Sequence, residues 1–160
     1  MVSEQELLNA IDTYGDMVKR LCVVYLKNQA DSEDIFQSVF LKYYQTNKNF
    51  QSAEHLKAWL VRVTINACKD HLRDFFNSHK VGLDEVIEKP VLEDPLNKLV
   101  FEAVLSLEKK YREVIYLYYY EGYKADEISK LLHKNTNTIY SLLSRAREKL
   151  KILLGGEEID

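Results

Sequence analysis

The chain has 160 residues, of which 46% are hydrophobic and 29% charged, which suits one folded domain or two small ones and excludes a disordered chain. No apolar run approaches the ~20 residues of a membrane span, and the acidic, amphipathic start does not resemble a secretory signal. The net charge is −3, yet residues 48–80 hold six basic against three acidic residues, and 124–151 hold seven against three. Such local positive patches allow nucleic-acid binding despite the negative total.

The first half of the chain shows apolar residues at helical spacing and no sustained alternation of the kind found in half-buried strands. Gly15-Asp16 could separate two helices or break a single one. Asp31 or Ser32 is suited to cap the following helix, because either side chain can accept hydrogen bonds from free backbone amides. The predicted helices cover 4–12, 16–28, about 31–45, and 53–76.

Residues 77–95 lose this spacing and contain both prolines, Pro90 and Pro95, with most of an acidic block. We therefore expect an all-α protein with two small helical domains, at 1–78 and 96–154. A flexible acidic linker at 79–95 joins them, and a tail at 155–160 closes the chain.

Gly122 is predicted to stop the helix expected at 108–121. Residues 124–147 have the form of a helix-turn-helix: a short helix, a turn of three or four residues, and a second helix. The second helix, from about Thr136 to Leu154, has a predicted core face with polar residues on its other side. Hydroxyl and guanidinium groups there are suited to base edges and phosphates. The same pattern also fits a plain helical hairpin with a solvated polar face. The predicted core residues are Ile139, Leu142, Leu143 and Ala146.

The sequence offers no catalytic constellation and no expected cofactor. Cys22 and Cys68 are isolated, which favours two buried thiols in a reducing compartment. Cys68 and His71 lie three residues apart on one predicted helix, but two ligands do not make a metal site. We therefore expect neither an enzyme nor a metalloprotein.

Two blocks of the sequence resemble the extracytoplasmic-function group of the sigma-70 family of sigma factors. Region 2 of that group is similar to YGDMVKRLCVVYLKNQADSEDIFQSVFLKYY, continued by HLKAWLVRVTINACKDHLRD. Region 4 is similar to LEKKYREVIYLYYYEGYKADEISKLLHKNTNTIYSLLSRAREKLK. The resemblance covers most of 10–80 and 100–152, in the family's order. It implies a cytoplasmic, bacterial transcription initiation factor that binds core RNA polymerase and promoter DNA and is held by an anti-sigma protein, without membrane insertion.

By this resemblance, one helix of region 2 docks on the polymerase large subunit. The segment has an acidic start, an exposed glutamine and large apolar neighbours, which suits a helix-on-helix contact. Phe40, Val39 and Ile35 also fit the protein's own core, and this reading is favoured for them. Ser38 stands where the family usually has Glu. The candidate polymerase-binding residues are Asp34, Gln37, Phe40 and Leu41.

The next helix of region 2 corresponds to the family's reader of the −10 promoter element. Asparagine can bond a base edge, and arginine can hold a phosphate or stack on an extruded base. Trp59 is favoured as a core residue, and Asp70 as a partner of Arg73 at i,i+3. The family's dense basic run after this point is replaced here by DFFNSHK. The candidate −10 residues are Arg62, Asn66 and Arg73.

Region 4 corresponds to the family's reader of the −35 element. Tyr140 stands where the family often has Arg or Lys, and Leu142 where it often has Arg. His133 takes a turn position at which glycine fits more easily, and Lys134 adds a charge that could reach phosphate. The candidate −35 residues are Thr138, Tyr140, Ser141, Ser144, Arg145 and Arg147.

The leading prediction is thus an RNA polymerase sigma factor that directs core polymerase to promoters and assists opening of the −10 element. Its acidic linker would follow the polymerase, since its charge mimics nucleic acid. Two alternatives remain open from the residues: a polymerase- or regulator-binding module without initiation activity, and a stand-alone helix-turn-helix repressor with the first domain as its dimerisation unit.

Overall fold

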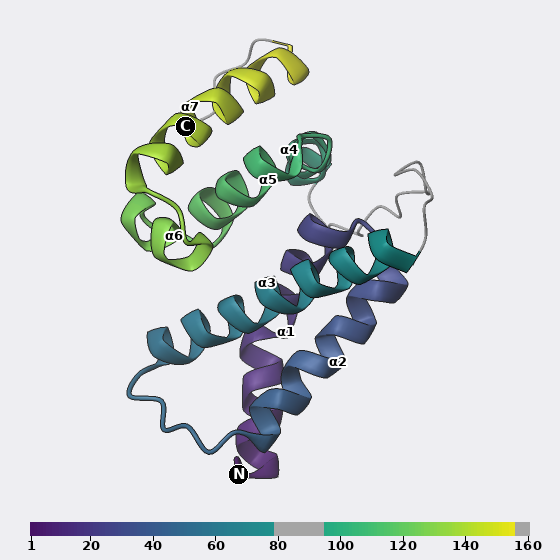
Figure 1. The fold of residues 1–160 in the computed structure, drawn as a ribbon, viewed down its shortest axis with the longest axis vertical. Coiled ribbons are helices and arrows are strands. Elements are labelled where there is room, and N and C mark those ends of the chain that lie inside the picture. The colour runs from purple at the N-terminus through teal and green to yellow at the C-terminus, as the bar shows by residue number, and fades with distance from the viewer. Residues whose placement is uncertain (79–94, 156–160) are drawn as a thin grey trace. The chain divides into compact units, whose positions relative to one another are not determined.

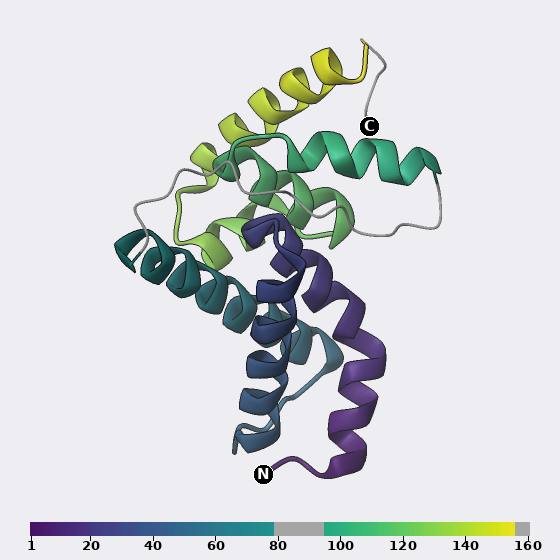
Figure 2. The same cartoon turned by 90° about the vertical axis from the view of Figure 1, so that its right-hand side faces the viewer.

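A computed structural model describes residues 1–78 and 95–155 of the chain. The chain divides into two compact units, Met1–Glu88 and Lys89–Asp160. Within the described ranges every regular element is a helix, as the spacing of apolar residues predicts (Figures 1 and 2). Nearly all of the predicted linker, at 79–94, and the tail after Gly155 lie outside the described residues.

The first unit is a bundle of three helices, α1 (Glu4–Leu26), α2 (Gln29–Gln45) and α3 (Ala53–Ser78), each of which packs against the other two (Figure 1). Their apolar stripes meet in a core that excludes solvent, and burial of these side chains is the main force holding the bundle together. Both cysteines are fully buried there, as predicted. Core side chains with 0% exposure include Val18, Leu21, Val24, Val39, Leu60 and Val61.

The break predicted at Gly15-Asp16 is wrong, because α1 runs through both residues without interruption. A glycine inside a helix costs about 1 kcal/mol relative to alanine. The buried residues on both sides, such as Ala10 and Met17, outweigh that cost because they belong to one continuous stripe. Gly15 is itself buried against the ring of Phe36 from α2, so the residue read as a breaker is part of the α1–α2 contact.

The second unit contains α4 (Pro95–Leu105), α5 (Lys109–Ile115), α6 (Ala125–Leu132) and α7 (Thr136–Leu153). Its longest helix, α7, packs against α4, α5 and α6. Ile139, Leu143 and Ala146 line the buried side of α7 at 0 to 1% exposure, as their spacing predicts. The helix-turn-helix is therefore anchored by a core of its own.

Residues Tyr116–Tyr120 extend α5 by one turn of π-helix, η1, which the sequence did not predict. The Glu121 amide donates to the Tyr116 carbonyl five residues earlier, at 3.3 Å. The rings of Tyr116 and Tyr120 stack, with their centroids 5.4 Å apart and their planes 10° from parallel. Gly122 ends the turn with φ +74, a conformation that favours glycine, and this confirms it as the predicted stop.

Candidate nucleic-acid interface

The exposed side of α7 carries the residues that the resemblance assigns to the −35 element. Asn135 caps the helix, with its Oδ1 accepting from the Asn137 amide at 2.8 Å, so the first turn is held in place. Tyr140 is 60% exposed although its neighbour Ile139 is completely buried. The polar side is therefore open to a ligand over its first three turns. Its exposed candidates are Thr138, Tyr140, Ser141, Ser144 and Arg145.

Arg147 differs from the other −35 candidates because it is half-buried and engaged inside the unit. Its Nε donates to the Tyr119 hydroxyl at 2.6 Å. The guanidinium also lies over the rings of Tyr118 and Tyr119, 5.5 and 5.6 Å from their centroids. Arg147 thus ties α7 to the π turn, a role that sequence reasoning missed. The only signal for it is the run of tyrosines that precedes the helix-turn-helix.

The turn between α6 and α7 is built from polar contacts. His133 ends α6 in the left-handed conformation, φ +54, which confirms that it takes a position better suited to glycine. Lys134 Nζ lies 3.6 Å from Glu113 Oε1, and that carboxylate is 4% exposed. The Thr136 hydroxyl donates to the Ser129 hydroxyl at 3.3 Å. The Thr136–Ser129 bond joins α6 to α7, and the Lys134–Glu113 ion pair joins the turn to α5.

The candidate −10 residues share one exposed face of α3. Arg62, Asn66 and Arg73 are separated by four and seven residues, which places them along one line of the helix. Lys69 falls on the same line, between Asn66 and Arg73, and was not among the predicted residues. Its spacing of three from Asn66 is the signal that could have identified it. The predicted Asp70–Arg73 pair is confirmed, at 3.2 Å between Oδ1 and Nη2.

The polymerase-docking candidates divide into exposed and buried residues. Asp34, Gln37 and Leu41 are exposed at spacings of three and four, so they form one continuous strip along α2. Leu41 leaves 54% of its surface open to solvent. Phe40 is 3% exposed and its ring lies 4.8 Å from that of Phe36, so it belongs to the core, as the apolar stripe favoured.

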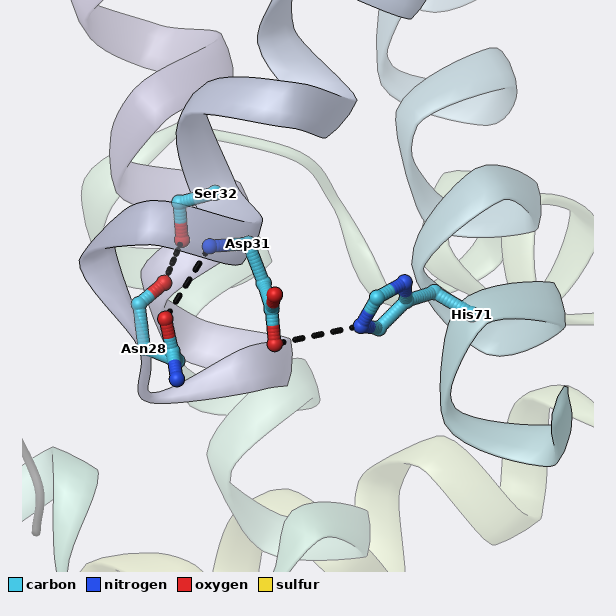
Figure 3. A network of polar contacts seen from close by, with 4 residues as sticks. All are labelled: Asn28, Asp31, Ser32 and His71. Atoms are coloured by element: carbon cyan, nitrogen blue, oxygen red, sulfur yellow. Dashed lines mark hydrogen bonds and ion pairs between the residues drawn. The ribbon is translucent and has the colours of Figure 1, made fainter. Parts of the chain in front are cut away.

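A polar network fixes the start of α2 at an earlier residue than the sequence predicts (Figure 3). Asn28 is the N-cap, because its Oδ1 accepts from the Asp31 amide at 3.0 Å. The predicted caps, Asp31 and Ser32, lie in the first turn, and the Ser32 hydroxyl donates back to the Asn28 carbonyl at 2.6 Å. The error is one of register: the cap lies three residues before Asp31, so both predicted caps are already inside the helix.

His71 of α3 points at this network, with its Nε2 3.2 Å from Asp31 Oδ2 (Figure 3). It therefore joins the start of α2 to the later turns of α3, the helix that carries the −10 candidates. The two side chains are about one-third exposed, so the contact is weakened by solvent. Within the described residues, no group of three His, Cys, Asp or Glu side chains is arranged to hold a metal ion.

An aromatic cluster closes the loop between α2 and α3. Trp59 is half-buried, with its ring centroid 5.4 Å from Phe50 and 6.3 Å from Tyr43. It therefore packs within the unit, as its place in the apolar stripe favours.

Burial, with the charges of Glu6 and Tyr14, raises the pKa of the Tyr43 hydroxyl above its ordinary value of 10.0.

The fold and these surfaces define a class of protein: two helical units, one a three-helix bundle with an exposed polar helix face, the other a helix-turn-helix with an open reading face. Comparison with known families specifies the class further. The family model for sigma-70 region 2 matches residues 10–74. The model for sigma-70 region 4 matches residues 98–150.

Relatives match over nearly the whole chain. RNA polymerase sigma factor SigV of Bacillus subtilis (strain 168) is 29% identical over 156 residues, which cover 96% of this chain and 93% of that protein. The ECF RNA polymerase sigma factor SigW of the same organism is 27% identical over 158 residues, covering 88% and 84%.

A solved structure has the same fold. The sigma factor RpoE of Bartonella quintana, in complex with the anti-sigma factor NepR, matches with a TM-score of 0.75 and 24% identity, covering 97% of this chain and 98% of that one. The two family matches together span most of this chain. The chain belongs to the sigma-70 family of RNA polymerase sigma factors, in its extracytoplasmic-function group.

Proposed function

We propose that this sigma factor directs core RNA polymerase to promoters by means of the three surfaces described above, and that it assists opening of the −10 element. The observation that carries the proposal is the pairing of region 2 and region 4 in one chain, each in its own helical unit with an exposed polar face. A stand-alone repressor needs no region 2, so this pairing disfavours it.

Polymerase docking is assigned to the strip formed by Asp34, Gln37 and Leu41. An acidic start followed by an exposed apolar side chain suits a partner helix of basic and apolar character. Phe40 supports this strip from the core, and we assign it no direct contact with the polymerase because its side chain is buried.

The −10 element is assigned to Arg62, Asn66 and Arg73 on α3, with Lys69 added from its place on the same line. Opening a promoter exposes bases whose edges asparagine can bond and whose stacked faces arginine can cover. Within the described residues, no other face of the first unit aligns two arginines, a lysine and an asparagine in this way.

The −35 element is assigned to the exposed side of α7, from Thr138 to Arg145. A helix of this size fits the major groove of DNA, where each base pair presents a distinct pattern of donors and acceptors. Arg147 acts through the orientation of α7, since its guanidinium is held by Tyr119.

We also propose that the protein works in the cytoplasm as a specificity subunit without catalysis of its own, and that an anti-sigma protein restrains it. Family membership supports all three points, and the fold relative RpoE was itself solved in complex with an anti-sigma factor. None of the described helices is both long and apolar enough to cross a membrane.

Transcription from genomic DNA by bacterial core polymerase plus the full chain, with sequencing of the transcript starts, tests the proposal. Specific starts that disappear without the chain are the expected result. Arg62→Ala and Asn66→Ala should reduce them, whereas the exposed α1 variant Asn9→Ala should not. Core binding without transcripts would indicate a module without initiation activity, and DNA binding without polymerase a repressor; either outcome contradicts the proposal.

A further inference from the structure

The base-facing part of α7 carries no positive charge. Its first two and a half turns, Thr136 to Ser144, contain neither lysine nor arginine, and the first basic residue of the helix is Arg145. At 100° per residue, the line opposite the buried stripe passes through Asn137, Ser141 and Ser144, all exposed. Tyr140 flanks that line on one side and Arg145 on the other.

This arrangement separates two kinds of contact. When a helix lies in the major groove, its outermost line faces base edges, and long side chains on its flanks reach either the outer base edges or the two phosphate backbones. Neutral amide and hydroxyl groups therefore face the bases here. The cationic Arg145 lies on a flank and past the first two turns, where it is suited to a phosphate or to a base at the end of the site.

The chemistry of base edges makes this neutral line selective. Guanine is most often read by arginine or lysine bonded to its O6 and N7, and the line offers neither. Adenine is read by the amide of asparagine, which Asn137 supplies. The methyl group of thymine is read by apolar contact, and serine hydroxyls bond any of the bases.

Tyr140 provides the apolar contact. Its ring is 60% exposed, the highest exposure among the large apolar side chains of the first three turns of α7. The fold does not need the ring, because the neighbouring Ile139 and Leu143 fill the core at 0 and 1% exposure. An exposed aromatic ring beside a line of base-reading groups is placed to cover a thymine methyl.

We infer that the −35 element of this sigma factor is read as A·T base pairs over the first two turns of α7, with Asn137 bonding an adenine and the Tyr140 ring covering a thymine methyl. The inference rests on the proposed reading of −35 DNA by α7 and names the base pairs that this reading selects.

The test is in vitro transcription by core polymerase and the full chain from a library of DNA templates with randomised upstream sequence, followed by sequencing of the productive templates. The unmodified chain should enrich A·T pairs at adjacent positions of the −35 element. Tyr140→Ala should lower the thymine preference at one position by about threefold or more, and Tyr140→Phe should keep it, because the ring remains.

Tyr140→Arg should raise guanine at or next to the same position by about tenfold, since a bidentate arginine–guanine pair is worth about that factor. Asn137→Ala should weaken an adenine preference on a neighbouring pair. Lys151→Ala, an exposed substitution near the far end of α7, is the matched control and should leave the selected sequence unchanged.

Enrichment of G·C pairs at the positions that respond to Tyr140 and Asn137 substitution would overturn the inference and leave the proposed function standing. An unchanged selection by Tyr140→Ala would remove the thymine contact and overturn it as well. Productive templates with no selected −35 sequence at all would overturn the −35 reading itself, and this inference with it.

Discussion

Phe40 and Leu41 are neighbours in sequence with opposite environments, which makes them a matched pair for separating folding from polymerase binding. Phe40 is 3% exposed and Leu41 is 54% exposed on the same helix. Replacing each with alanine removes a large apolar side chain from the protein core in one case and from the proposed docking strip in the other.

For Phe40→Ala we expect a loss of about 3–5 kcal/mol in the free energy of unfolding, the usual cost of truncating a buried phenylalanine. The centroid of its ring lies 4.8 Å from that of Phe36, so the truncation leaves a cavity beside the Phe36 ring. A small domain is stable by only about 5–15 kcal/mol, so this variant should melt far below the unmodified chain.

For Leu41→Ala we expect a change of about 0.5 kcal/mol or less in stability, because the side chain is exposed. Full burial of a leucine is worth about 1.5–3 kcal/mol, and roughly half of this one is still available to a partner. Its removal should therefore weaken binding to core polymerase by about 1 kcal/mol, or roughly fivefold in Kd.

Thermal unfolding followed by circular dichroism, and equilibrium binding to core polymerase, measure the two effects separately. Equal melting temperatures for the two variants would refute the assignment of Phe40 to the core. Unchanged polymerase affinity in the folded Leu41→Ala protein would refute the docking strip.

Three further outcomes follow from contacts in the two units. Tyr119→Phe keeps the ring under Arg147 but removes its hydrogen bond, so chemical denaturation should show a loss of about 1 kcal/mol; an unaltered unfolding curve would contradict the tie between α7 and the π turn. Asp70→Asn removes an anion 3.2 Å from Arg73 at an exposed site, so it should strengthen promoter binding at low salt. A salt titration should show this gain in affinity shrinking at high salt, and the free energy of unfolding should change by no more than about 0.5 kcal/mol. The raised pKa of the Tyr43 hydroxyl means that the unfolded chain releases this proton near pH 10.0 while the folded protein still holds it. The contribution of Tyr43 to the free energy of unfolding is therefore full below pH 10.0 and is lost as the pH rises through the folded-state pKa. Tyr43→Phe should flatten the fall in stability above pH 10.0, and an identical fall in both proteins would count against the raised pKa.

The all-helical class and the candidate faces can be predicted from the pattern of residues alone. Apolar spacing of three and four residues leaves only one side of each helix able to enter a core, so the burial of Ile139 and Leu143 could be read directly. The same spacing predicts that Arg62, Asn66 and Arg73 share one face. Local signals also identified His133 and Gly122, because both positions need a backbone conformation that few residues adopt.

Which polar side chains are exposed and which hold the fold together depends on how the helices pack. Arg147 reads as a DNA contact from its position on α7, yet Tyr119 holds it across 28 residues of sequence at 2.6 Å. The sequence predicts no partner for His71, yet its side chain faces Asp31 on another helix. Such contacts depend on how helices distant in sequence pack against one another, and helical periodicity carries no information about the partner that packing supplies.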